Sequence, residues 1–144
     1  MPSKKFKKTI GRKELVDFPK LGLYDIAAKI DTGAYTSSIH CHEIEPYQKN
    51  GYSMVKFNLL DPSHKAYNNK EFRLPVHSRK KVKNSFGDQE NRFSIMTIIQ
   101  LYEKNFFIEL ALTDRSKMEF PILIGRKFLL GKFIVDVARY NLSK

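Results

Sequence analysis

The chain has 144 residues, which suits one domain with a modest hydrophobic core. Basic residues outnumber acidic ones by 26 to 15, and the net charge of +11 would either attract a polyanion or an acidic peptide or serve only to keep the protein soluble. One cysteine excludes an intrachain disulfide, and no apolar segment suits a transmembrane helix or a secretory signal, so the expected compartment is the cytoplasm.

The predicted elements are short strands separated by turns. A flexible basic tail is expected over residues 1–8, followed by a single domain over 9–142. One short helix is expected at 127–130, ending at Gly131. Strands are predicted at 9–18, 24–30, 36–44, 52–60, 70–76 (extended by 79–82), 92–101, 106–112, 122–124 and 133–137. Many short strands with frequent turns indicate an all-β fold, a closed β-barrel with one short C-terminal helix.

The tetrapeptide Asp31-Thr32-Gly33-Ala34 directly follows the predicted strand that ends at Ile30. The Thr32 hydroxyl can close a turn there, and Gly33 permits a close approach that a side chain would forbid. A carboxylate held at such a strand end can reach a second carboxylate across a narrow gap. The alternative is that Asp31 is a turn residue whose side chain binds backbone amides.

Asp31-Thr32-Gly33-Ala34 matches the active-site motif of the aspartic proteases. The run Ile122 to Arg126, followed by Lys127 to Leu130, resembles the apolar strand, Gly-Arg pair and short helix of retropepsins. Over about residues 9–142 the chain resembles a bacterial family of retropepsin-like aspartic endopeptidases, formerly "ATP-dependent zinc proteases", which includes the RimB-type proteins. This resemblance rests further on segments 10–13, 36–40, 44–46, 82–92, 108–115 and 131–136. It implies a barrel of the retropepsin type.

The resemblance also implies a reaction. Aspartic proteases hydrolyse peptide bonds with two carboxylates about 3 Å apart that share one proton. Asp31 is the candidate catalytic residue, in a turn supported by Thr32, Gly33 and Ala34. No other aspartate of the chain is followed by Thr-Gly or Ser-Gly, so the second carboxylate would come from a second copy of the chain in a homodimer.

Two further segments receive roles from the resemblance. Asn84, Ser85, Phe86 and Gly87 stand where retropepsins carry the flap that covers the substrate, although an ordinary hairpin tip is equally compatible. Gly125 and Arg126 are expected to be structural residues near the site.

Arg126 would hydrogen-bond either backbone or a carboxylate, with Asp136 as one candidate partner or merely a strand-end residue. Tyr35 stands where retroviral proteases have an acidic residue, so their mode of holding the substrate backbone does not transfer directly.

The older family name raises the question of zinc and ATP. His40 and His42 are the candidate zinc ligands, because both are expected on one strand face, with Cys41 on the other. The motif His-Glu-x-x-His is absent, and the segment from Gly125 to Lys132 lacks the Ser or Thr of a phosphate-binding loop. No cofactor is therefore expected.

Two other functions stay open. The chain could be a non-catalytic protease-fold protein that accompanies a RimK-type glutamate ligase, since members of the resembling family occur in that context. A peptide or protein partner rich in acidic residues would suit the basic surface. The chain could also be a nucleic-acid-binding module, because basic clusters alternate with Phe6, Tyr67, Phe72 and Phe86, but no recognised nucleic-acid motif supports this.

Overall fold

The computed structural model describes residues 7–83, 86–114 and 119–144. Two short helices occur in this part of the chain, and neither is long and apolar enough to span a membrane. The elements are β1 (Lys8–Ile10), β2 (Lys13–Phe18), the 3₁₀ turn η1 (Pro19–Leu21), β3 (Leu23–Ile30), β4 (Ser37–Lys49), β5 (Tyr52–Leu59), β6 (Glu71–Pro75), β7 (Ser78–Lys83), β8 (Gln89–Leu101), β9 (Lys104–Thr113), β10 (Ile122–Ile124), α1 (Arg126–Leu129) and β11 (Phe133–Val135).

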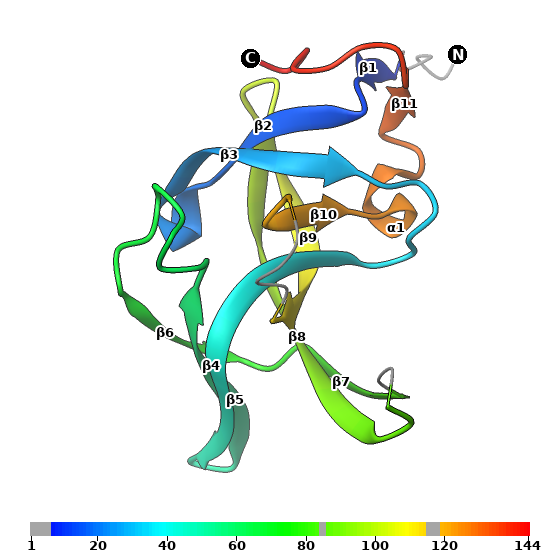
Figure 1. Ribbon diagram of the computed structural model, residues 1–144. Helices are drawn as coiled ribbons and strands as arrows, with labels where there is room; N and C mark the ends of the chain where they lie inside the picture. Colours follow the sequence, from blue (N-terminus) through cyan, green and yellow to red (C-terminus); the bar gives the residue numbers. More distant parts are fainter. Residues whose placement is uncertain (1–6, 84–85, 115–118) are drawn as a thin grey trace, which may run out of the picture.

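Six strands close a mixed β-barrel in the order β10, β3, β2, β8, β9 and β4 (Figure 1). The barrel closes because β10 pairs on both sides, in parallel with β3 and antiparallel with β4. All three residues of β10 are buried, which explains their continuous apolar run. Closure leaves the barrel strands without free edges. The predicted all-β barrel with one short α-helix near the C-terminus is confirmed.

The barrel interior is built from alternating apolar positions. On β3, Ile26, Ala28 and Ile30 are buried, while Lys29 between them is exposed. Each large apolar side chain buried in this way contributes roughly 1.5–3 kcal/mol relative to an exposed one. This inward alternation holds β3 in one register, and that register determines where Asp31 leaves the barrel.

Two strand pairs extend beyond the barrel. In Figure 1, β4 runs down from the barrel into a hairpin with β5, and β7 forms a second hairpin with β8. The prediction that residues 79–82 extend the strand ending at 76 is wrong. The Val76 amide donates to the Ser53 carbonyl at 3.0 Å, whereas the His77 amide donates to the Ser94 carbonyl at 2.7 Å. The chain therefore changes neighbours between residues 76 and 77.

The predicted strand over 9–18 is also divided in two, at Gly11. A Cβ at Gly11 would lie 2.3 Å from the Arg139 carbonyl oxygen, so the C-terminal segment passes directly over this point. β1 pairs in parallel with β11 instead of continuing into the barrel. The buried Glu14 carboxylate holds the C-terminal segment, because it accepts the amides of Gly11, Leu142 and Ser143 at 2.7, 3.1 and 2.9 Å.

Candidate active site

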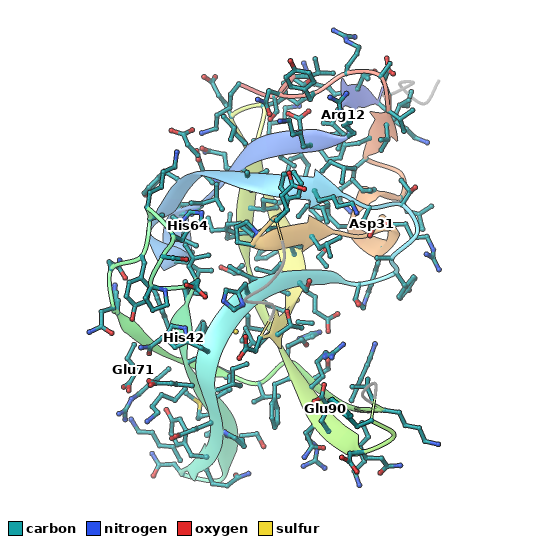
Figure 2. The ribbon with its side chains drawn as sticks, viewed as in Figure 1. Arg12, Asp31, His42, His64, Glu71 and Glu90 are labelled. Atoms are coloured by element: carbon teal, nitrogen blue, oxygen red, sulfur yellow. The ribbon has the colours of Figure 1, made fainter. Side chains whose placement is uncertain are left out.

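Asp31 lies at the end of β3, on the side of the barrel where α1 lies (Figure 2). Its amide donates to the Ile124 carbonyl of β10 at 2.8 Å, and its carbonyl accepts the Ala34 amide at 3.2 Å. Its side-chain Oδ1 accepts the Gly33 amide at 3.0 Å. A Cβ at Gly33 would lie 3.2 Å from this oxygen, so a larger residue at position 33 would require the Asp31 carboxylate to shift by a few tenths of an ångström. Backbone contacts of the turn therefore hold Oδ1 of the Asp31 carboxylate in place.

The junction between β10 and α1 supports the same turn from the other side. The Gly125 amide donates to the Ser37 hydroxyl at 3.0 Å, and the Arg126 amide donates to the Ala34 carbonyl at 2.8 Å. A Cβ at Gly125 would lie 2.7 Å from the carbonyl oxygens of both Tyr35 and Thr36. The backbone contact is so close that only glycine fits at position 125 without a shift of the turn.

The Arg126 side chain contacts the turn backbone and no carboxylate among the described residues. Its Nη1 donates to the carbonyls of Gly33 and Thr32 at 3.2 and 3.4 Å, and its guanidinium lies 5.4 Å from the ring centroid of Tyr35. Asp136 is not its partner, because the Asp136 carboxylate accepts the Ala138 amide at 3.0 Å in a local turn. Of the two roles considered for Asp136, the strand-end role agrees with this geometry.

The turn is open to solvent in a single protomer. Thr32 and Gly33 are exposed and Asp31 is half-buried. Within the described part of the chain, Oδ2 of Asp31 has no hydrogen-bond partner, which leaves this oxygen available to a water or a second carboxylate. The geometry can therefore present one carboxylate oxygen outward while the other is held by the Gly33 amide.

Glu109 is the site neighbour that sequence reasoning missed. Its Oε2 accepts the Ser94 and Ser78 hydroxyls at 2.6 and 2.9 Å, and its Oε1 accepts Nζ of Lys127 at 2.8 Å. Burial by itself would raise the pKa of Glu109, but the bonds from Lys127 and the two serines outweigh it and lower that pKa to about 2. The Lys127 amide donates to the Tyr35 carbonyl at 3.0 Å, so this cluster joins the β7–β8 hairpin to the active-site turn.

The only sequence signal for Glu109 was a lone carboxylate in the otherwise apolar run from Phe106 to Leu112. Such a residue in a strand of a closed barrel requires a partner.

The candidate zinc ligands lie elsewhere, on β4, where Figure 2 shows His42 well away from Asp31. His40 is buried, with its Nε2 3.8 Å from Asp61 and its Nδ1 3.9 Å from Asp114. His42 Nδ1 bonds to the Leu60 carbonyl at 2.8 Å. No group of three potential ligand side chains that could hold a metal occurs among the residues that the structure describes. Cys41 is also buried, and burial raises the pKa of its thiol.

The flap candidates are only partly described. Asn84 and Ser85 lie outside the described residues. Phe86 is 89% exposed, and Gly87 has a φ of +83° that suits a tight turn. Both lie at the tip of the hairpin between β7 and β8, a position that fits either a flap or an ordinary hairpin tip.

Comparison of the sequence with known protein families identifies the family of this chain. The family model described as RimB-like, retropepsin-like aspartic endopeptidase RimB, matches residues 9–144. The chain belongs to this RimB-like family. A crystal structure of a Legionella pneumophila protein of unknown function, DUF785, is similar to this RimB-like chain with a TM-score of 0.76 and 25% identity. The match covers 95% of this chain and 98% of that one.

Curated relatives of this RimB-like chain are larger proteins. A probable alpha-L-glutamate ligase of Desulfotalea psychrophila is 38% identical over 132 residues, and one of Shewanella pealeana is 37% identical over 131 residues. The matches cover 92% and 88% of this chain but 28% of each relative. The RimB-like domain thus corresponds to a little over a quarter of these ligases.

Proposed function

We propose that this RimB-like domain is an aspartic endopeptidase that hydrolyses peptide bonds with two Asp31 carboxylates, one from each protomer of a homodimer. The observation that carries the proposal is the turn at Asp31, in which backbone bonds from β10 and Gly33 hold a carboxylate at the surface. The match to the RimB-like family over residues 9–144 supports it.

In the proposed reaction the two carboxylates share one proton, because two charges about 3 Å apart cannot both persist. The ionised carboxylate takes a proton from a water, which attacks the scissile carbonyl carbon. The protonated carboxyl group donates its proton to the carbonyl oxygen. As the tetrahedral intermediate collapses, the proton taken from water passes to the leaving nitrogen and the C–N bond breaks to release the amine. One hydroxyl of the intermediate returns a proton to the other carboxylate, which restores the shared proton. Thr32, Gly33, Ala34, Gly125 and Arg126 would maintain the geometry and take no part in proton transfer.

Exposed apolar side chains on the segment that follows α1 support dimerisation. Leu130, Ile134 and Val137 are 70, 54 and 75% exposed along the segment that follows α1. The start of α1 is bonded directly to the active-site turn, through the amides of Arg126 and Lys127. A second copy that packed against these three side chains would bury apolar surface and bring a second Asp31 toward the first.

The proposed substrate class is acidic peptide. The net charge of +11 would attract it, and the relatives named as probable alpha-L-glutamate ligases point to a glutamate-containing partner. The same two observations favour a second candidate function, in which the domain is a non-catalytic companion of a RimK-type glutamate ligase.

Replacement of the proposed catalytic carboxylate tests hydrolysis. We expect the wild-type protein to cleave members of a glutamate-rich peptide library and Asp31→Asn to lose this activity by at least about 1,000-fold, because an amide cannot act as a base or share the proton. Mass spectrometry would detect the products, and circular dichroism would confirm that the variant is folded. The wild-type pH profile should be bell-shaped.

Asp25→Asn is the matched control, since Asp25 is an exposed aspartate on the same strand. It should cleave as the wild type does. Cleavage by Asp31→Asn at the wild-type rate would remove Asp31 from the mechanism. A wild-type protein that cleaves nothing but alters glutamate addition by a separate ligase would favour the companion function.

A further inference from the structure

A basic hollow lies apart from the active-site turn. It has a volume of about 440 Å³ and lies between the start of β1, the β8–β9 turn and the link from α1 to β11. Four lysines line it, Lys7, Lys8, Lys104 and Lys132. We call it the lysine hollow. It shares no lining residue with the turn from Asp31 to Tyr35 or with Gly125 and Arg126.

Aromatic side chains form the floor of the lysine hollow. Phe106 packs edge-on against Phe133 and Phe128, with ring centroids 5.6 and 5.9 Å apart. The Tyr102 hydroxyl donates to the Thr9 carbonyl at 2.5 Å. These contacts restrain the side chains of Tyr102, Phe106 and Phe133, which line the hollow.

Among the described residues, the lysines of the hollow have no carboxylate partner. No ion pair joins Lys7, Lys8, Lys104 or Lys132 to an acidic side chain in the part of the chain that the structure describes. Nζ of Lys8 lies 4.9 Å from the ring centroid of Tyr102, and Nζ of Lys132 donates to the Phe128 carbonyl at 3.0 Å. Four positive charges therefore surround one cavity, and their mutual repulsion would be relieved by an anionic ligand.

We propose that the lysine hollow is a docking site for an acidic peptide segment, whose carboxylates pair with the four ammonium groups. The chemistry favours a peptide over a nucleic acid. The ring faces already contact one another or Lys8, so little aromatic surface remains for stacking bases. The lining contains no arginine, the side chain best suited to bidentate phosphate contacts.

This inference rests on the proposed function for its choice of an acidic substrate. In that setting the hollow would hold one part of a long acidic chain while another part enters the site at Asp31. Docking of this kind raises the local concentration of the cleavable segment without new contacts at the active site.

The test measures binding in the absence of hydrolysis. In the Asp31→Asn protein, fluorescence anisotropy would follow binding of a labelled peptide of ten glutamates. We expect the double variant Lys7→Glu, Lys104→Glu to raise the dissociation constant by at least about tenfold, since two attractive charges become repulsive. Both side chains are exposed, so the fold should persist. The matched control is Lys20→Glu, Lys49→Glu, which changes net charge equally at exposed lysines outside the hollow.

A selective loss in the hollow variant, with no more than about a twofold change in the control, would support the docking site. Equal losses in both variants would show that only net charge matters and would overturn it. Tighter binding of a single-stranded DNA of equal charge would also overturn it, in favour of nucleic acid. Because the readout is binding, failure of this proposal leaves hydrolysis by the wild-type protein separately measurable.

Discussion

At the scale of single residues, Gly125 shows how the backbone restricts side-chain choice beside the site. The amides that follow it bind the carbonyls of Ala34 and Tyr35, so α1 and the active-site turn are in direct contact. A methyl group at position 125 would meet backbone atoms 2.7 Å away, and backbone cannot yield as a flexible side chain does. The sequence showed a Gly-Arg pair, but the contact that requires the glycine is tertiary.

We therefore expect Gly125→Ala to reduce the free energy of unfolding by about 1–3 kcal/mol and to abolish most peptidase activity. Urea unfolding and peptide cleavage would measure the two effects. The control is Gly131→Ala, where φ is +76° but nothing lies within 4 Å of the added Cβ. It should cost about 1 kcal/mol through backbone strain alone and leave activity intact. Equal losses of activity would contradict the role given to the contact at Gly125.

At the scale of elements, the cluster around Glu109 connects four of them. Ser78 belongs to β7, Ser94 to β8 and Lys127 to α1, and all three donate to one carboxylate on β9. The base of the β7–β8 hairpin and the helix beside the active-site turn therefore share one partly buried ionic cluster. A change in its charge should alter both stability and the position of the hairpin relative to the turn.

The lowered pKa of Glu109 determines how stability depends on pH. Because the folded-state pKa is about 2, below the ordinary value of 4.5, this group stabilises the fold above pH 4.5. The contribution, about 1–2 kcal/mol after allowance for the half-exposed Lys127, is lost as pH falls from about 4.5 toward 2. Glu109→Gln should therefore be less stable than wild type at pH 7, and the difference should shrink by pH 2–3.

Thermal unfolding across this pH range would test the expectation. Glu90→Gln is the control, since Glu90 is an exposed carboxylate on β8 paired with Arg92 at 3.0 Å. Its effect on stability should be within about 0.5 kcal/mol at every pH. A Glu109→Gln protein as stable as the wild type at pH 7 would mean that the ionic cluster does not stabilise the fold.

At the scale of the whole molecule, the proposed activity depends on two copies of the chain. The barrel is closed by β10, so its own strands offer no edge to a partner, but the segment with Leu130, Ile134 and Val137 exposes apolar side chains. Burial of such a segment is the ordinary driving force for association. The catalytic dyad and the dimer should therefore be lost together.

We expect Ile134→Glu to be a folded monomer without peptidase activity, because a buried unpaired charge opposes association. Sedimentation would give the oligomeric state, and wild-type specific activity should fall on dilution as dimers dissociate. Tyr52→Glu is the control, at a side chain that is 72% exposed on the β4–β5 hairpin. An active monomeric Ile134→Glu protein would show that one chain suffices.

Local sequence patterns were sufficient to predict the local features of this protein. Three features are each encoded within a few residues: alternation on β3, the apolar run of β10, and the Asp-Thr-Gly turn that follows β3. Strand periodicity and turn chemistry are local properties. The barrel, the short helix after Gly125 and the family could therefore be predicted. The place of Asp31 at the end of β3 followed from the same pattern.

The tertiary structure was needed to show which residues far apart in the chain are in contact. Three features join residues far apart in the chain. They are the insertion of β10 between β3 and β4, the contact of Gly11 with the C-terminal segment, and the hydrogen bonds that Glu14 and Glu109 accept. Local patterns carry no information on such partners, since a strand of given periodicity can pair with any strand of matching faces. For the same reason, the sequence could not predict that the chain changes neighbours after Val76. It also could not predict that lysines from β1, β9 and the link before β11 cluster together.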